Sequence, residues 1–435
     1  MRDFPLHTGL SILTTGALLF AIRLVPANVP PPENAAPRSG PAPAAAPASA
    51  PAPIIKPGTP PPLFDDSAGA LDNFYRALAR TEARDAGAVT RIVHYGDSPT
   101  TADLITGDVR ALLQAKFGDA GHGFLLVAKP WAWYQHTGVQ LSGSGWKPLP
   151  ASRFIAQDGL FGLAGVSFTG GTNASTRIRF EKSAYTNFEL WFLRQPGGGS
   201  VKLTADGAPL GIVDTSGDTK GPGYAAFDAP AAASTVELHV TQGKVRMFGV
   251  SAGRAGPGLV YDTLGLNGAS VTVFTRMFNE HHWAAELQHR NPDLVIVNYG
   301  TNEADFPDFV DKQYEKELRA AIGRLRTALQ QTSLLIMSPM DRGHKTGPSQ
   351  IATMPTIPRI VAIQRRVAHD TGCGFFDTFQ AMGGDGTMAR WYAAQPRLVS
   401  ADFIHPYPAG GKIIAQVIVR ELVSGLDRYK TRAIR

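Results

Sequence analysis

The sequence predicts an α/β protein: a three-layer α/β/α arrangement around a parallel sheet, with an all-β, sandwich-like domain inserted into it. Short apolar runs alternate with amphipathic helical patterns on either side of the insert, which is typical of a parallel sheet covered by helices. Between about residues 135 and 255 the hydrophobic period changes to two, the period of a strand. With 435 residues, 43% of them hydrophobic, the chain can bury one large core and a smaller one.

Residues 1–27 are expected to be a signal peptide or a membrane anchor. Arg2 precedes an apolar stretch from Leu10 to Ile22, which is typical of an export signal. This stretch is short for a bilayer core of about 30 Å, so cleavage and retention both stay open. Residues 28–62 consist mostly of Pro, Ala, Ser and Gly and are expected to form an extended linker, or a tail without a role. We therefore expect an exported protein, periplasmic or extracellular, with possible anchoring to the inner membrane.

Residues 63–134 are expected to form the first part of the α/β domain. The apolar run Arg91–Tyr95 fits a buried strand and leads directly into Gly96, Asp97 and Ser98. Apolar residues then recur at helical spacing, at Ile105, Val109, Leu112, Leu113 and Phe117. Ser98 is therefore predicted to lie at a strand-to-helix turn.

Residues 135–255 are expected to form the inserted β-sandwich domain. Apolar and polar residues alternate at 177–180 and at 235–240. The Asp-Gly pair at 206–207 is a hairpin signal, and the PGGG segment at 196–199 separates two further strands. A compact sandwich is the simplest account of these patterns.

Residues 256–435 are expected to complete the α/β domain. Continuous apolar runs, typical of parallel strands covered on both faces, alternate here with helical patterns. The strands are expected at 294–297, 333–337 and 374–377, and the helices at 314–329, 360–367 and 414–422.

Three residues could carry acyl transfer by serine, which requires a nucleophile, a base and a group that fixes the base. Ser98 is the candidate nucleophile, because a helix N-terminus beside it favours developing negative charge. Asp402 and His405 stand three residues apart just before the last helix, a spacing that lets the carboxylate hold the imidazole. Taken singly, Ser98 fits an ordinary turn and Asp402 a helix cap.

Two further residues could donate hydrogen bonds to the oxyanion. Asn302 follows an apolar run at the expected carboxyl edge of the sheet, where open α/β sheets build their sites. Gly268 lies in a predicted loop, where a glycine N–H permits close approach. Taken singly, each is better explained as a residue that shapes a turn.

Four segments in order resemble the blocks of the SGNH/GDSL hydrolase superfamily: HYGDS (94–98), GLNGAS (265–270), NYGTNE (298–303) and DFIH (402–405). The resemblance covers the two parts of the α/β frame, about residues 63–134 and 256–435. It implies the SGNH type of sheet, with Ser98 as nucleophile and Asp402 and His405 completing a catalytic triad. It also implies an oxyanion hole formed by Ser98, Gly268 and Asn302.

The chain departs from the family pattern after the serine, where Pro99 replaces the usual leucine or histidine. Proline is acceptable at a first helical position. The placement of the β-insert is similar to that in bacterial peptidoglycan and polysaccharide O-acetylesterases, whose insert resembles a carbohydrate-binding module, and this implies an O-acetylated glycan as substrate. Trp131, Trp133 and Tyr134 precede the insert, where aromatic rings could stack on sugars, although core packing is expected for at least one of them.

Several other classes of function fit the sequence poorly. The net charge of +6 is scattered rather than clustered, so we expect no nucleic-acid partner. The single cysteine, Cys373, excludes an internal disulfide and a Cys-rich zinc site, and we expect it to be buried and inert. His122, His281 and His282 lack metal-ligand spacing. We expect neither a metal nor a cofactor.

Alternatives to an acetylesterase stay open at this point. An O-acetyltransferase would use the same residues with a sugar hydroxyl as acceptor. A non-catalytic glycan-binding protein would keep the fold without turnover. A metallophosphoesterase is disfavoured, because its Asp-x-His block is missing and Thr301-Asn302-Glu303 lacks the histidine ligand.

Overall fold

The structure, a computed structural model, describes residues 62–153, 158–182, 184–348 and 350–433. The signal or anchor expected over residues 1–27 lies outside the described residues, and so does the expected linker except for its last residue. Among the helices of the described ranges, none has the length and apolar character needed to cross a membrane.

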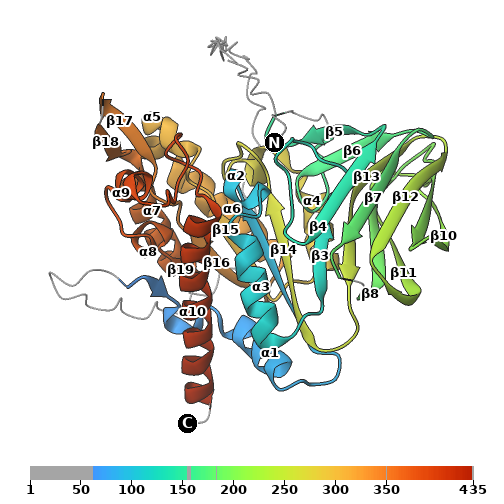
Figure 1. Ribbon diagram of the computed structural model, residues 1–435, viewed down its shortest axis with the longest axis horizontal. Helices are drawn as coiled ribbons and strands as arrows, with labels where there is room; N and C mark the ends of the chain where they lie inside the picture. The colour runs from blue at the N-terminus through green and yellow to red at the C-terminus, as the bar shows by residue number, and fades with distance from the viewer. Residues whose placement is uncertain (1–61, 154–157, 183, 349, 434–435) are drawn as a thin grey trace, which may run out of the picture. The chain divides into compact units, whose positions relative to one another are not determined.

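A six-stranded sheet forms the frame of the α/β part (Figure 1). Its order is β1-β19-β16-β15-β2-β14, and all neighbours are parallel except the antiparallel edge pair β1–β19. Its strands are β1 (Phe64–Asp65), β2 (Val89–Gly96), β14 (Gly258–Gly265), β15 (Leu294–Asn298), β16 (Ser333–Met337) and β19 (Gly374–Phe376).

Helices cover both faces of this sheet, because alternate strand residues point to opposite sides. Along β2, Ile92 packs into one buried core, whereas Val93 and Tyr95 pack into the other. The Ile92 face is covered by α1 (Asp72–Glu82), α3 (Thr106–Phe117) and α10 (Pro408–Ala433). The other face is covered by α4 (Glu280–Arg290), α6 (Tyr314–Ala328) and α7 (Thr356–Asp370). The predicted three-layer α/β/α fold is confirmed.

Shorter elements connect this frame. The short helical elements are η1 (Ser67–Gly69), α2 (Ser98–Thr101), η2 (Val273–Met277), η3 (Glu303–Asp305), α5 (Pro307–Lys312), α8 (Thr378–Ala381) and α9 (Thr387–Ala393). A separate hairpin pairs β17 (Gly343–Gly347) with β18 (Gln350–Thr353).

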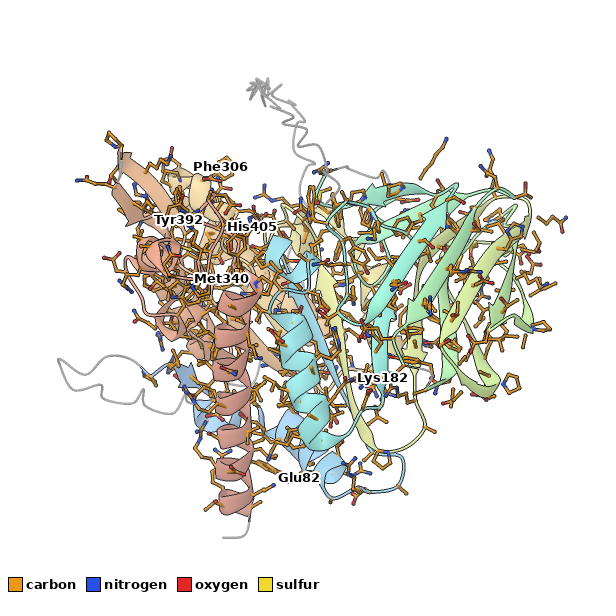
Figure 2. The ribbon with its side chains drawn as sticks, in the orientation of Figure 1. Glu82, Lys182, Phe306, Met340, Tyr392 and His405 are labelled. Atoms are coloured by element: carbon orange, nitrogen blue, oxygen red, sulfur yellow. The ribbon has the colours of Figure 1, made fainter. Side chains whose placement is uncertain are left out.

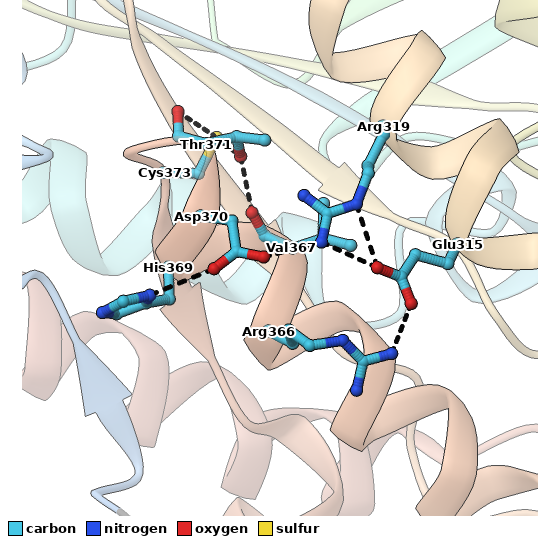
Figure 3. Close-up of polar contacts among 8 residues, drawn as sticks. All are labelled: Glu315, Arg319, Arg366, Val367, His369, Asp370, Thr371 and Cys373. Atoms are coloured by element: carbon cyan, nitrogen blue, oxygen red, sulfur yellow. Dashed lines mark hydrogen bonds and ion pairs between the residues drawn. The ribbon is translucent and has the colours of Figure 1, made fainter. Parts of the chain in front are cut away.

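Charged side chains join α6 and α7 at the surface (Figure 3). Arg319 contacts Glu315 on its own helix and Asp370 of α7, each at 2.7 Å, and Arg366 of α7 pairs with Glu315.

The single cysteine, Cys373, lies outside this network of ion pairs and is buried, as expected. Burial raises the pKa of its thiol.

Between α3 and β14 the chain forms two antiparallel sheets that share one core, as the predicted sandwich requires. Ile178 and Leu203 enter this core from one sheet, and Phe168 and Leu190 enter it from the other. The first sheet has the order β10-β9-β12-β7-β4, with β10 (Ala208–Asp214), β9 (Ser200–Ala205), β12 (Thr235–Gln242), β7 (Ser175–Phe180) and β4 (Val139–Ser144). The second has the order β11-β8-β13-β6-β5, with β11 (Gly221–Ala233), β8 (Tyr185–Arg194), β13 (Val245–Gly253), β6 (Val166–Gly170) and β5 (Lys147–Pro150).

The antiparallel sheets begin earlier in the chain than the change of period at residue 135. Strand β3 (Gly121–Leu125) pairs with β13, and Val250 lies opposite Leu125. Every residue of β3 is buried, so the strand shows no two-residue alternation that would mark it in the sequence.

Candidate active site

Three loops that carry predicted site residues leave the sheet at one edge. Gly96 at the end of β2 is paired with Gly265 of β14 on one side and with Asn298 of β15 on the other. Ser98 follows β2, Gly268 follows β14 in the Gly268 loop (residues 266–270), and Asn302 follows β15 in the Asn302 loop (residues 299–303). Parallel strands bring their carboxyl ends together, and open α/β sheets build their sites there.

Two glycines allow α2 to sit directly on the strand ends. A Cβ atom at Gly96 would lie 2.1 Å from the Thr100 hydroxyl, and one at Gly265 would lie 2.1 Å from the Thr101 backbone nitrogen. Both distances are far below contact, so these positions require glycine. Ser98 is the first residue of α2, and Pro99 fits the first helical turn without a lost hydrogen bond.

The structure brings Ser98, His405 and Asp402 into one hydrogen-bonded chain. Nε2 of His405 lies 2.7 Å from Ser98 Oγ, and Nδ1 lies 2.6 Å from Asp402 Oδ2. The other carboxylate oxygen accepts hydrogen bonds from the backbone N–H groups of Ile404 and His405 and from the Ser400 hydroxyl. The Asp402 carboxylate therefore shapes the turn that presents the imidazole. Figure 2 shows His405 near the start of α10.

Charges around His405 act on its pKa in both directions. The hydrogen bond to Asp402 raises the pKa of His405, the nearby Asp97 raises it further, and Arg342 lowers it. Burial alone would raise the pKa of Asp402, but the hydrogen bonds from His405, Ser400 and the backbone hold it well below its usual range. Asp402 is thus ionised at neutral pH, and its charge favours the cationic imidazole.

Donors for an oxyanion are present in the two neighbouring loops. Gly268 has φ +72°, a left-handed conformation that favours glycine. Within the described part of the chain, the N–H groups of Ser98 and Gly268 have no hydrogen-bond acceptor. Nδ2 of Asn302 donates to the Ala269 carbonyl at 2.8 Å, which ties the Asn302 loop to the Gly268 loop and leaves a second amide hydrogen.

Sequence reasoning missed Glu303 and Arg342, which hold the Asn302 loop. Glu303 is buried, and its two carboxylate oxygens accept from the N–H groups of Val271 at 2.8 Å and Gly300 at 3.0 Å. Nη1 of Arg342 donates to the Thr301 carbonyl at 2.6 Å, and its Nη2 contacts both carboxylate oxygens of Asp305, at 2.7 and 2.8 Å. Glu303 adjoins Asn302 in its motif, which was a usable signal, whereas no motif marks Arg342.

Asp97 is a further acidic group at the site. It is buried, and burial raises its pKa to about 6, while a hydrogen bond from Thr301 and the charge of His405 oppose this rise. Asp97 is therefore mostly ionised above neutral pH and places a second negative charge near His405.

Residues outside this site have other surroundings. No group of three or more His, Cys, Asp or Glu side chains within the described ranges is arranged to hold a metal ion. His122 contacts His136 at 3.0 Å, and His282 lies 3.6 Å from Glu286. Of the aromatic residues before the insert, Trp131 and Tyr134 are buried in the core and Trp133 is 48% exposed.

Part of the sequence matches a known family. Residues 234–413 match the model of the GDSL-like Lipase/Acylhydrolase family; this range includes Gly268, Asn302, Asp402 and His405 and begins after Ser98. No curated protein matches the sequence.

Among solved structures, a peptidoglycan O-acetylesterase shares the fold: it is 22% identical, with a TM-score of 0.71 over 84% of this chain and 100% of its own. A family two carbohydrate esterase from Clostridium thermocellum is 12% identical, with a TM-score of 0.28 over 65% of this chain and 99% of its own. Residues 234–413 thus carry a GDSL-like lipase/acylhydrolase domain, and this match together with the shared fold supports an esterase of the SGNH class.

Proposed function

We propose that this protein is a serine esterase of the SGNH class that removes O-acetyl groups from a cell-envelope or extracellular glycan, such as peptidoglycan or a polysaccharide, through an acyl-enzyme on Ser98. The observation that carries this proposal is the hydrogen-bonded chain from Ser98 Oγ through His405 to Asp402. The resemblance in fold to a peptidoglycan O-acetylesterase supports an acetylated glycan as substrate. We also propose export, on the evidence of the apolar N-terminal stretch.

The reaction begins when His405 Nε2 takes the Ser98 proton and Oγ attacks the acetyl carbonyl carbon. The carbonyl oxygen becomes an oxyanion, which the N–H groups of Ser98 and Gly268 and the Asn302 amide stabilise. As the intermediate collapses, His405 returns the proton to the departing sugar oxygen, and the acetyl group stays on Ser98. Asp402 holds the imidazole in the tautomer that this transfer needs.

Water completes the cycle by attacking the acetyl-Ser98 ester, again with His405 as base. The side chains of His405 and Asp402 are 36% and 46% exposed, so water has access to the imidazole. Water can therefore serve as the acceptor in this step.

The test uses the full-length protein with soluble O-acetylated peptidoglycan strands, O-acetylated polysaccharides and p-nitrophenyl acetate. Ser98→Ala should abolish acetate release from all of them and leave thermal unfolding unchanged, whereas Ser142→Ala, on the exposed sandwich strand β4, should release acetate at the wild-type rate. Undiminished release by Ser98→Ala would exclude the mechanism. Acetylated product formed on an added acceptor sugar would assign the chain as a transferase, and glycan binding without any turnover would assign it as a binding protein.

A further inference from the structure

An exposed tryptophan lies beside the Gly268 loop. The indole N–H of Trp133 donates to Asn267 Oδ1 at 3.2 Å, and Asn267 precedes Gly268 in the chain. Trp131 and Tyr134 on either side are buried, and the Tyr134 hydroxyl accepts a hydrogen bond from the Leu126 N–H at 3.1 Å. The buried neighbours Trp131 and Tyr134 and the hydrogen bond to Asn267 therefore fix the Trp133 ring, although about half of its surface faces solvent.

A cavity of about 260 Å³ begins at the residues that follow Trp133. Its polar lining includes Lys129, Gln135, His136 and Gln140. Gln135 joins the cavity to the active-site helix, because its Nε2 donates to the Ala102 carbonyl at 3.1 Å, directly after α2. This volume lies just below the roughly 300–1,000 Å³ typical of sites for drug-sized ligands, so it suits a unit the size of one sugar ring.

The polar groups of the cavity have unused hydrogen-bonding capacity. His136 is buried, and its Nε2 has no partner within the described chain. Burial lowers the pKa of His136 to about 4, so its imidazole is neutral at physiological pH. Lys129 is exposed and forms no ion pair with any described residue, and the Gln140 amide offers both a donor and an acceptor.

A pyranose ring matches this combination of groups. It presents an apolar C–H face, which can stack on a flat indole, and a rim of hydroxyls that needs several donors and acceptors. A rigid aromatic ring also loses little conformational freedom on binding.

We propose that Trp133 and the cavity lined by Lys129, Gln135, His136 and Gln140 form a glycan-binding subsite, here named the junction subsite. It holds the sugar unit next to the acetylated one and so directs the acetyl ester of a polymeric substrate towards Ser98. This inference rests on the proposed function and gives the start of the β-insert a role in substrate binding.

The first experiment compares Trp133→Ala with wild type on soluble O-acetylated peptidoglycan strands and on p-nitrophenyl acetate, which has no second sugar unit to occupy the junction subsite. We expect kcat/KM on the strands to fall about tenfold, mainly through KM, as the loss of one stacking contact predicts, and activity on p-nitrophenyl acetate to stay within twofold of wild type. Trp133→Phe should recover most of the loss, because it restores a flat ring. Ile212→Ala, which removes another exposed apolar side chain on β10, should change neither activity.

Equal losses on both substrates would show that Trp133 only supports the Gly268 loop, and unchanged kcat/KM on the strands would show that the ring binds no sugar; either result overturns the proposal. A second experiment separates the subsite from catalysis by measuring strand binding to Ser98→Ala protein by calorimetry. Adding Trp133→Ala or Gln140→Ala to that protein should weaken binding about tenfold. If the wild type released no acetate but bound the strands in a way that depends on Trp133, the proposed function would be contradicted. The junction subsite would still be supported.

Discussion

Glu303 and Val271 are joined by a buried hydrogen bond of 2.8 Å between the carboxylate of the first and the backbone N–H of the second. The other carboxylate oxygen accepts from the Gly300 N–H at 3.0 Å. Glu303 therefore connects the segments that follow β14 and β15, from which Gly268 and Asn302 come. Together with the Asn302–Ala269 hydrogen bond, this side chain fixes the spacing between two proposed oxyanion donors.

Replacing Glu303 by Gln should lower kcat on p-nitrophenyl acetate more than it raises KM. The amide NH₂ of Gln would face one of the two backbone N–H groups that the carboxylate now accepts from. That buried N–H would lose its acceptor, which should lower the unfolding free energy by about 1–3 kcal/mol. Kinetics and thermal unfolding check both effects. Glu280→Gln, at a half-exposed position on α4, is the matched control. A stability loss with unchanged kcat would mean that Glu303 only supports the fold.

The same substitution should also change how stability depends on pH. Burial raises the pKa of Glu303 to about 7 from an ordinary value of 4.5. A carboxyl group with a raised folded-state pKa favours folding while protonated, and this contribution is lost as pH rises from 4.5 through 7. The difference in unfolding free energy between wild type and Glu303→Gln should therefore be larger at pH 5 than at pH 8. Urea denaturation at both pH values measures it, and an equal or reversed difference contradicts the assignment.

Asp402→Asn should reduce kcat by about 10³–10⁴-fold while leaving the fold intact. The Asn amide would place N–H groups against His405 Nδ1, which lies 2.6 Å from the carboxylate in the wild type. The ring would then carry its proton on Nε2, facing Ser98, and could not accept the serine proton. Steady-state kinetics measure the loss, and circular dichroism monitors the fold. A decrease below tenfold would show that Asp402 is dispensable for orienting His405.

The pH dependence of kcat/KM should follow the protonation of His405, which accepts a proton only when neutral. Its pKa is raised above 6.5, first by the hydrogen bond to Asp402, so kcat/KM should rise with a midpoint above pH 6.5. Asp97→Asn removes a negative charge and should move the midpoint to lower pH. Arg342→Gln removes a positive charge and should move it to higher pH. Midpoints that stay fixed, or that move in the same direction, would contradict this account.

The parts of the fold predicted from sequence are those with local signals. Strand β15 is a continuous apolar run, and Asp402 and His405 lie only three residues apart, so both were visible. Strand β14 was missed because Asp262 interrupts its apolar run. That carboxylate is buried, where it pairs with Arg290 at 2.5 Å and accepts from the Phe124 N–H at 2.7 Å. These partners come from distant parts of the chain, and no local pattern could reveal them.

A buried ion pair connects the active-site helix to the β-insert. Asp103, two residues after α2, lies 2.6 Å from Arg110, and both side chains are almost fully buried. The Asp103 carboxylate also accepts from the Thr137 N–H at 2.8 Å, at the start of the insert. Burial alone would raise the pKa of Asp103, but the Arg110 guanidinium holds it well below its usual range.

Asp103→Ala should therefore lower the unfolding free energy by about 3–5 kcal/mol, because Arg110 would keep a buried, unpaired charge. Asp85→Ala is the control: it breaks the exposed Arg80–Asp85 pair, which should contribute at most about 1 kcal/mol. The pKa of Asp103 is lower in the folded state than its ordinary value of 3.8, which applies to the unfolded chain. The contribution of Asp103 to the unfolding free energy is therefore present above pH 3.8 and is lost as the pH falls below that value. Urea titrations of both variants at pH 7 and pH 3 test this. The loss of unfolding free energy caused by Asp103→Ala should be smaller at pH 3 than at pH 7. A loss of equal size at both pH values would mean that the carboxylate charge contributes nothing to stability.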